Sequence, residues 1–257
     1  MTTPDMRAAY DGSAAAWASG PERIYAQLAN ALVGCSPVPL SNARVLDLGA
    51  GTGVASRAAV ANGASRVVAL DYAAAMLPRE EKEVAPVVGD GCALPFGNRA
   101  FHLVMAAFSL SHFVDPLGAL TEVRRVSGAV LASTFVADWT HPAKDAVEKL
   151  LIAFGYQPPA WYQRLKQEGE PAVNTPAKLA RLARAAGFDN GTVHTISVAT
   201  GVDSPADLVG WRLGMAQVAP FVASLETADR AALQRAAEAA VADVPPLVVE
   251  MLALAAT

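Results

Sequence analysis

Short apolar runs alternate with amphipathic stretches along most of this chain. The predominantly apolar runs that read as strands are residues 44–49, 66–71, 84–89, 100–108 and 128–136. Apolar positions with helical spacing follow at residues 54–62, 116–126 and 176–186. Buried strands that alternate with helices predict an α/β protein with a mostly parallel sheet and helices on both faces.

Two further runs complete the expected sheet. Residues 192–200 resemble a sixth strand, and residues 246–254 fit either a final strand or a helix. The prolines before this last run and its β-branched start favour a strand. We therefore expect a seven-stranded sheet in which the run around Leu247–Leu254 is antiparallel to its neighbours.

Three stretches do not follow this alternation. Residues 5–34 are helical by the spacing of their apolar side chains, and two prolines within residues 35–42 end that pattern. Residues 138–175 and 202–244 are helical or irregular. We interpret these two as insertions attached to the sheet core, not as separate domains.

Composition and charge narrow the classes of function. The 257 residues are 53% hydrophobic, and the formal net charge is −4. Because no cluster of Lys and Arg is present to neutralise phosphates, a nucleic-acid partner is disfavoured. Cys35 and Cys92 lack metal-ligand spacing, and two reduced thiols are the simplest interpretation. No signal peptide and no apolar run of about 18 residues is found, so we expect a cytoplasmic protein without a membrane partner.

A glycine-rich loop carries the clearest chemical signal. Glycines 49, 51 and 53 lie between a predicted strand and a predicted helix, where they let a ligand approach the backbone. Val54 occupies the position where the dinucleotide fingerprint has its last glycine. Asp47 would repel a pyrophosphate but could hold a cationic ammonium group. Asp71 ends the next strand, and its carboxylate can accept both hydroxyls of a ribose.

The surrounding motifs extend this signal. VLDLGAGTG resembles motif I of the class I S-adenosylmethionine (SAM)-dependent methyltransferases, and GASRVVALDYAAAML is similar to their second motif. VVGDGCALPF and FHLVMAAFSLSHFVDP resemble two segments of the small-molecule branch that includes the UbiE-like enzymes. The four motifs occur in the family's order over residues 45–116. One departure is His102, which follows Phe101 where the branch commonly has Asp at a structural position near the sheet edge.

The resemblance implies a Rossmann-like fold with SAM as cofactor, a core over residues 43–257, and helical insertions that form a substrate cap. It also implies that residues 1–42 form an N-terminal helical lid that carries Tyr10. The cofactor-binding residues it implies are Asp47, Gly49, Ala50, Gly51 and Gly53 at the methionine part, Asp71 at the ribose, Tyr72 and Met76 on the adenine, Gly89, Asp90, Gly91 and Cys92 at its amino group, and Ala107 and Phe108 at the pocket floor.

Several of these residues also have a purely structural interpretation. Gly53 alone suits a turn, and Asp71 suits a solvated strand end. Tyr72 and Met76 suit core packing, and Asp90 suits a helix cap or turn. The three glycines together are not explained by a turn.

Two histidines and several aromatic residues are candidates for contact with the methyl acceptor. His112 follows the fourth strand, where it suits either a general base or a structural cap before Pro116, and His141 is a second candidate for the base or a loop anchor. The candidate substrate-binding residues are His112, Trp17, Trp139, Trp161, Tyr162 and Trp211. Aromatic walls favour an apolar or aromatic acceptor, and Trp17 is equally explained by helix packing. We expect no metal, because no ligand cluster is present.

Three functions remain open at this point. The first is SAM-dependent methyl transfer to the O, N or C nucleophile of a small molecule, such as a secondary metabolite, by a monomer or homodimer. The second is a nicotinamide-dependent oxidoreductase, which Val54 disfavours. The third is a non-catalytic methyltransferase-like protein.

Overall fold

The computed structural model describes residues 4–79 and 81–257, so residues 1–3 of the expected lid lie outside the described residues. The strands are β1 (Arg44–Leu48), β2 (Arg66–Asp71), β3 (Val84–Val88), β4 (Leu103–Ala107), β5 (Val130–Phe135), β6 (Gly191–Ala199) and β7 (Val248–Ala256). The α-helices of the first half are α1 (Pro4–Ser19), α2 (Pro21–Val33), α3 (Val54–Ala61) and α4 (Pro116–Val126). Those of the second half are α5 (Pro142–Ala153), α6 (Ala160–Arg164), α7 (Glu170–Val173), α8 (Pro176–Ala185), α9 (Pro205–Leu213), α10 (Ala219–Ser224) and α11 (Thr227–Ala240). Three short helical segments are η1 (Ala74–Met76), η2 (Leu110–His112) and the π-helical η3 (Leu165–Gly169).

The seven strands form one sheet in the order β3-β2-β1-β4-β5-β7-β6. Strand β7 pairs antiparallel with both β5 and β6, and the other paired strands are parallel. In the register at the centre, Leu46 of β1 pairs with Val68 of β2 and with Val104 of β4. The expected seven-stranded, mostly parallel sheet is confirmed, and so is the antiparallel last strand over the run that ends the chain.

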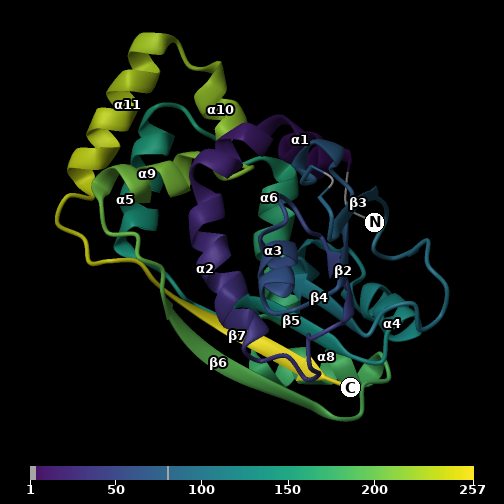
Figure 1. Ribbon diagram of the computed structural model, residues 1–257. Helices are drawn as coiled ribbons and strands as arrows, with labels where there is room; N and C mark the ends of the chain where they lie inside the picture. The colour runs from purple at the N-terminus through teal and green to yellow at the C-terminus, as the bar shows by residue number, and fades with distance from the viewer. Residues whose placement is uncertain (1–3, 80) are drawn as a thin grey trace.

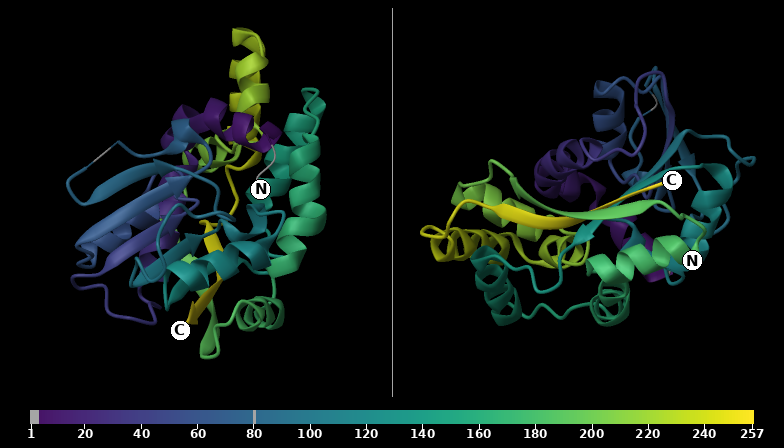
Figure 2. Two further views of the ribbon diagram at one scale, coloured as in Figure 1. Left: turned by 90° about the vertical axis from the view of Figure 1, so that its right-hand side faces the viewer. Right: turned by 90° about the horizontal axis from the view of Figure 1, so that it is seen from below.

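Successive side chains of the central strands enter two different cores, because a strand points alternate residues to opposite faces. Val45 of β1 belongs to the same core as Leu28 of α2, and the next residue, Leu46, belongs to the core that contains Leu120 of α4 and Leu179 of α8. These residues are buried, and the helices lie on both sides of the sheet (Figure 2). This two-sided burial explains why the central strands β1, β4 and β5 are mostly apolar.

His102, which stands where the family commonly has Asp, lies at the amino ends of β1 and β4, away from the glycine loop. Its Nδ1 accepts a hydrogen bond from the backbone N–H of Arg44 at 2.9 Å, and its own N–H donates to the Arg44 carbonyl. The imidazole of His102 therefore accepts the hydrogen bond from the backbone N–H at the start of β1. An aspartate carboxylate at this position can accept the same hydrogen bond.

The helices of the two insertions pack on one another at one end of the molecule. Helix α5 comes from the first insertion, and it contacts α9 and α11 of the second. Figure 1 shows this group at upper left, with α1 and α2 between it and strands β2 and β3. The residues expected to form one N-terminal helical region form α1 and α2, which are separated at Gly20.

The strand order reverses between β1 and β4, because β2 and β3 lie to one side and β5 to the other. Loops that leave the carboxyl ends of two such strands diverge, and open α/β sheets bind ligands in the crevice that results. A large cavity opens here. It has a volume of about 790 Å³ and is lined from β1, β2, β4 and β5, from α1 and α2, and from both insertions.

Candidate active site

The glycine loop forms one wall of this cavity. Gly49, Gly51 and Gly53 have φ values of 71°, 52° and 82°, in the left-handed region that favours glycine. A Cβ on Gly49 would also lie 2.5 Å from Cβ of Ser109, so a side chain has no room there. Gly49, Ala50 and Gly51 line the cavity. Gly53 does not line it, and instead forms the N-cap of α3 beside Pro78.

Asp71 closes the loop from the neighbouring strand. Its Oδ2 accepts a hydrogen bond from the N–H of Gly51 and its Oδ1 one from the N–H of Ala73, both at 2.8 Å. Burial raises the pKa of this carboxyl, and the backbone hydrogen bonds partly oppose the rise. The carboxylate lines the cavity, where its remaining lone pairs can accept further hydrogen bonds.

Asp47 lies beneath the loop, not in the cavity. It is 1% exposed, its Oδ2 accepts a hydrogen bond from Oγ of Ser56 at 2.7 Å, and it does not line the cavity wall. Burial raises the pKa of Asp47 to about 6, against the opposing hydrogen bond from Ser56. Of the two roles expected for Asp47, the geometry favours organising the loop and α3 over direct contact with a ligand.

The segment after β3 contributes two of its four expected residues. Gly89 and Gly91 line the cavity, whereas Asp90 and Cys92 do not. The carboxylate of Asp90 accepts a hydrogen bond from the N–H of Cys92 at 3.0 Å, which is a turn-forming role. In this structure Asp90 therefore has the turn geometry that its Gly-Asp-Gly setting also allowed.

Helix α1 lies over the part of the cavity that is lined by the segment after β2. The guanidinium of Arg7 lies 4.9 Å from the centroid of the Tyr72 ring, and Asp11 accepts a hydrogen bond from the N–H of Ala75 at 2.8 Å. Tyr72 and Met76 line the cavity beneath it. The N-terminal helix is thus joined to the segment after β2 by contacts that the sequence pattern did not indicate.

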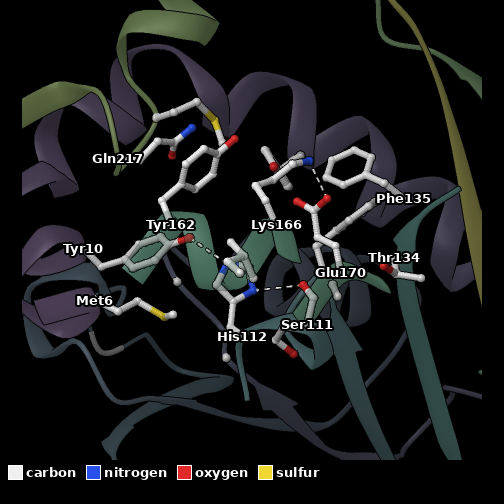
Figure 3. A pocket seen from close by; sticks show the side chains of 18 of the residues that line it. Met6, Tyr10, Ser111, His112, Thr134, Phe135, Tyr162, Lys166, Glu170 and Gln217 are labelled. Atoms are coloured by element: carbon white, nitrogen blue, oxygen red, sulfur yellow. Dashed lines mark hydrogen bonds and ion pairs between the residues drawn. The ribbon is translucent and has the colours of Figure 1, made fainter. Parts of the chain in front are cut away.

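The segment after β4 brings a histidine and a tyrosine together. Ala107, Phe108 and His112 line the cavity, and Nε2 of His112 lies 2.9 Å from the hydroxyl of Tyr10 on α1. Figure 3 shows this pair, with the hydroxyl of Ser111 on the other ring nitrogen at 3.3 Å. Burial lowers the pKa of His112 to about 4, although backbone hydrogen bonds at Phe108 and Ser109 partly oppose this. The imidazole is therefore neutral at pH 7.

Aromatic side chains continue from this pair along the cavity. We call seven of them the aromatic belt, and all of them line the cavity: Tyr10, Trp17, Tyr25, Phe108, Phe135, Trp139 and Trp211. Each ring lies within 6.4 Å, centroid to centroid, of the next one in this series. Tyr25 also contacts Phe135 at 6.4 Å. Phe135 and Trp139 are stacked, with 10° between their planes. Tyr162 lines the same compartment (Figure 3).

Two of the residues expected to contact the methyl acceptor lie outside the cavity. His141 is the N-cap of α5: its Nδ1 accepts a hydrogen bond from the N–H of Ala143, and its Nε2 lies 3.1 Å from the carbonyl oxygen of Pro245. Both ring nitrogens have partners and the residue is 5% exposed, which fits the loop anchor that the sequence also allowed and not the base. Trp161 packs with Met6, Leu165 and the neighbouring Tyr10, and its expected place in the cavity wall is wrong.

The cavity also contains charged residues that the sequence did not single out. Lys144 of α5, Lys166 and Glu170 near α7, and Arg212 of α9 all line it. Each is a single charged residue in an amphipathic helix, and such residues most often face solvent. Their convergence depends on how the two insertions pack, so no local pattern was available to reveal it.

Within residues 4–79 and 81–257, no group of three His, Cys, Asp or Glu side chains is arranged to hold a metal ion. Of the helices in that same part of the chain, none is long and apolar enough to cross a membrane.

Comparison with known proteins agrees with this geometry. The family model described as a methyltransferase domain matches residues 46–130. A demethylmenaquinone methyltransferase of Renibacterium salmoninarum is 34% identical over 143 residues, which cover 54% of this chain and 57% of that protein. One of Roseiflexus sp. is 31% identical over 179 residues, covering 62% and 74%. The first of these relatives is therefore matched over little more than half its length.

The fold is shared more widely than the sequence. A solved structure of a complex between the Haloferax volcanii Trm112 methyltransferase activator and a putative methyltransferase aligns with a TM-score of 0.56 at 20% identity, covering 98% of this chain and 96% of that one. None of these comparisons supports the nicotinamide alternative. The four motifs, the sheet order and the similarity over most of the Roseiflexus enzyme show that this chain belongs to the class I SAM-dependent methyltransferase family.

Proposed function

We propose that this protein binds SAM and transfers its methyl group to a small molecule with an aromatic or flat apolar body. The observation that carries the proposal is a single cavity that joins two chemically different compartments. One compartment has the glycine loop and the Asp71 carboxylate, and the other has the aromatic belt. Transfer between two bound molecules requires such a shared space, because the reacting atoms must meet away from water.

The residues around the loop fit SAM. Gly51 has left-handed backbone and lines the cavity without a side chain, so a ligand can approach the backbone there. We propose that Gly49, Ala50 and Gly51 hold the methionine part and that Asp71 accepts hydrogen bonds from the ribose hydroxyls. Tyr72, Met76, Gly89 and Gly91 would then surround the adenine, and α1 would act as the lid.

SAM supplies a methyl carbon on a positively charged sulfur that departs as a neutral thioether. The protein therefore needs no covalent intermediate, and its residues contribute by binding, orienting and excluding water. The aromatic belt provides flat surfaces that would orient a ring of the acceptor. Helix α1 and the two insertions surround the cavity and would exclude water.

When the acceptor atom carries a proton, that proton must be removed. We propose that His112 and Tyr10 take this role, because they are in hydrogen-bonding contact and both line the cavity. The neutral imidazole can accept a proton at Nε2 from the Tyr10 hydroxyl, which can in turn accept one from the acceptor. Burial raises the pKa of Tyr10 well above its usual value, so the phenol remains protonated between transfers.

The substrates named for the relatives indicate a class of methyl acceptor but not a particular molecule. Both curated relatives are named for methylating demethylmenaquinone. An aromatic acceptor agrees with the belt, but the belt does not specify a quinone. The monomeric or homodimeric state and the cytoplasmic location stay predictions from the sequence.

The proposal is tested by incubating the purified protein with methyl-tritiated SAM and fractionated metabolite extracts enriched in aromatic compounds. We expect label to appear in an extracted small molecule with the parent protein. With the His112→Ala variant, turnover should fall about 100-fold or more while SAM affinity stays nearly unchanged. Absence of transfer to any fraction, by a protein that binds SAM, would favour the non-catalytic alternative. Full activity of His112→Ala would exclude the base.

A further inference from the structure

Arg212 is a buried arginine on the wall of the cavity. It lies near the end of α9, is 6% exposed, and its Nε is buried without a hydrogen-bond partner. No carboxylate of the described residues forms an ion pair with its guanidinium. Its one ring contact is with the neighbouring Trp211, whose centroid lies 5.1 Å from Cζ.

Burying an unpaired guanidinium lowers the stability of the folded protein. A guanidinium stays protonated even when buried, so it cannot escape the loss of hydration by becoming neutral. Buried charges are therefore normally paired with an opposite charge. A buried arginine that faces a cavity and has no counter-charge of its own is arranged to receive an anion from outside.

Lys144 of α5 supplies a second cation nearby. Its Nζ lies 4.8 Å from the centroid of the Trp139 ring, and the rings of Trp139 and Trp211 are 6.4 Å apart. Burial lowers the pKa of Lys144 to about 8, and repulsion from Arg212 contributes to the shift. The two cations thus lie over neighbouring rings at one end of the aromatic belt.

The carboxylates around the cavity offset this pair only in part: Glu170 and Asp145 act to raise the pKa of Lys144 against its burial, but neither forms an ion pair with it. Glu170 is engaged by Lys166 in an ion pair (Figure 3). Asp138, Asp145 and Glu148 are exposed, so water screens their charges. Asp71 is occupied with the backbone of the glycine loop.

We propose that Arg212 and Lys144 bind an anionic group of the methyl acceptor, and that this group is a carboxylate. The planar guanidinium matches a carboxylate through two parallel hydrogen bonds, and the stacked rings of Phe135 and Trp139 lie beside it for the flat body of the same molecule. The acceptor would then be an aromatic acid. This inference rests on the proposed function, since it names the substrate class of that site.

The test compares 1-naphthoate with its uncharged analogue 1-naphthamide. Both are titrated into the full-length protein, with tryptophan fluorescence as the signal, because Trp139 and Trp211 lie at the proposed subsite. We expect the acid to bind at least tenfold more tightly than the amide. Arg212→Gln should abolish this preference, and Arg212→Lys should keep part of it as a point charge. Arg230→Gln, on the exposed surface of α11, controls for the lost positive charge and should keep the preference in full.

Two further measurements separate the possible failures. Thermal unfolding should show that Arg212→Gln is at least as stable as the parent, because an unpaired buried charge is removed. If that variant does not fold, Lys144→Gln serves instead and should reduce the preference several-fold. Equal binding of acid and amide by the parent, or an unchanged preference in the variants, overturns the subsite. Failure of S-adenosylhomocysteine to bind the same protein would count against the proposed function. The preference for the acid over the amide is measured separately and tests the anion subsite independently of that result.

Discussion

Asp71 and His112 both line the cavity but differ in their environments. Asp71 fixes the glycine loop with two backbone hydrogen bonds and still faces the cavity. His112 is held neutral by burial and contacts Tyr10. We therefore predict that substitution of Asp71 changes cofactor affinity and that substitution of His112 changes turnover.

Asp71→Ala should weaken binding of S-adenosylhomocysteine by about 1–3 kcal/mol, because the ribose hydroxyls lose their acceptor. Isothermal titration measures the change. Asp243→Ala, an exposed acid in the loop before β7, is the matched control and should leave affinity unchanged. Equal affinity of the Asp71 variant and the parent, with both proteins folded, would remove the ribose role.

The buried histidine also predicts a pH dependence of stability. Its pKa is about 4 in the folded protein and 6.5 when exposed, so between these values the unfolded chain binds the extra proton. The stability that His112 contributes is present above pH 6.5 and is lost as the pH falls toward 4.

Denaturant unfolding at pH 7 and pH 5 tests this sign. His112→Gln should lose less unfolding free energy over that interval than the parent, by about 1–2 kcal/mol. Asp47, whose pKa is raised to about 6, titrates in the opposite direction, but it is present in both proteins and cancels in the comparison. Parallel losses in the two proteins would show that His112 is not buried in its neutral form.

At the scale of elements, the alternation of strands and helices was predictable and the packing of the insertions was not. Continuous apolar runs such as Arg66–Asp71 are diagnostic because both faces of the strand are covered. His141 caps α5, and Trp161 lies on the covered face of the short helix α6. Residue type and approximate place in the chain do not reveal either arrangement. Arg212 gave no signal for the same reason.

The packing of the α1–α2 junction on α9 predicts how two glycine substitutions change stability. A Cβ on Gly20 would lie 2.3 Å from the carbonyl oxygen of Gly210, whereas a Cβ on Gly210 itself would meet nothing within 4 Å. Gly20→Ala should therefore destabilise the protein by about 1–3 kcal/mol through overpacking. Gly210→Ala should stabilise it by up to about 1 kcal/mol, because alanine is the better helix former. Thermal unfolding of the pair decides this, and a harmless Gly20→Ala would mean that α9 does not pack closely on the α1–α2 junction.

At the scale of the whole molecule, one sheet supports both compartments of the cavity. The loops after β1, β2 and β3 provide the glycine and aspartate side, and the segments after β4 and β5 lead into the aromatic belt. The four sequence motifs cover the first side, so most of its residues could be named in advance. The second side is assembled from α1, α2 and two insertions that are distant in the chain, so only its aromatic character was predictable.

If the glycine-loop compartment binds SAM, the unmodified protein should bind its demethylated product. Calorimetric titration measures this binding directly. S-adenosylhomocysteine and NAD are titrated separately under the same conditions. We expect one site per chain for S-adenosylhomocysteine, with a dissociation constant on the micromolar scale, which corresponds to a binding free energy of about −8 kcal/mol, and no heat of binding for NAD. Binding of NAD in preference to S-adenosylhomocysteine, or no binding of the latter at millimolar concentration, would contradict this expectation.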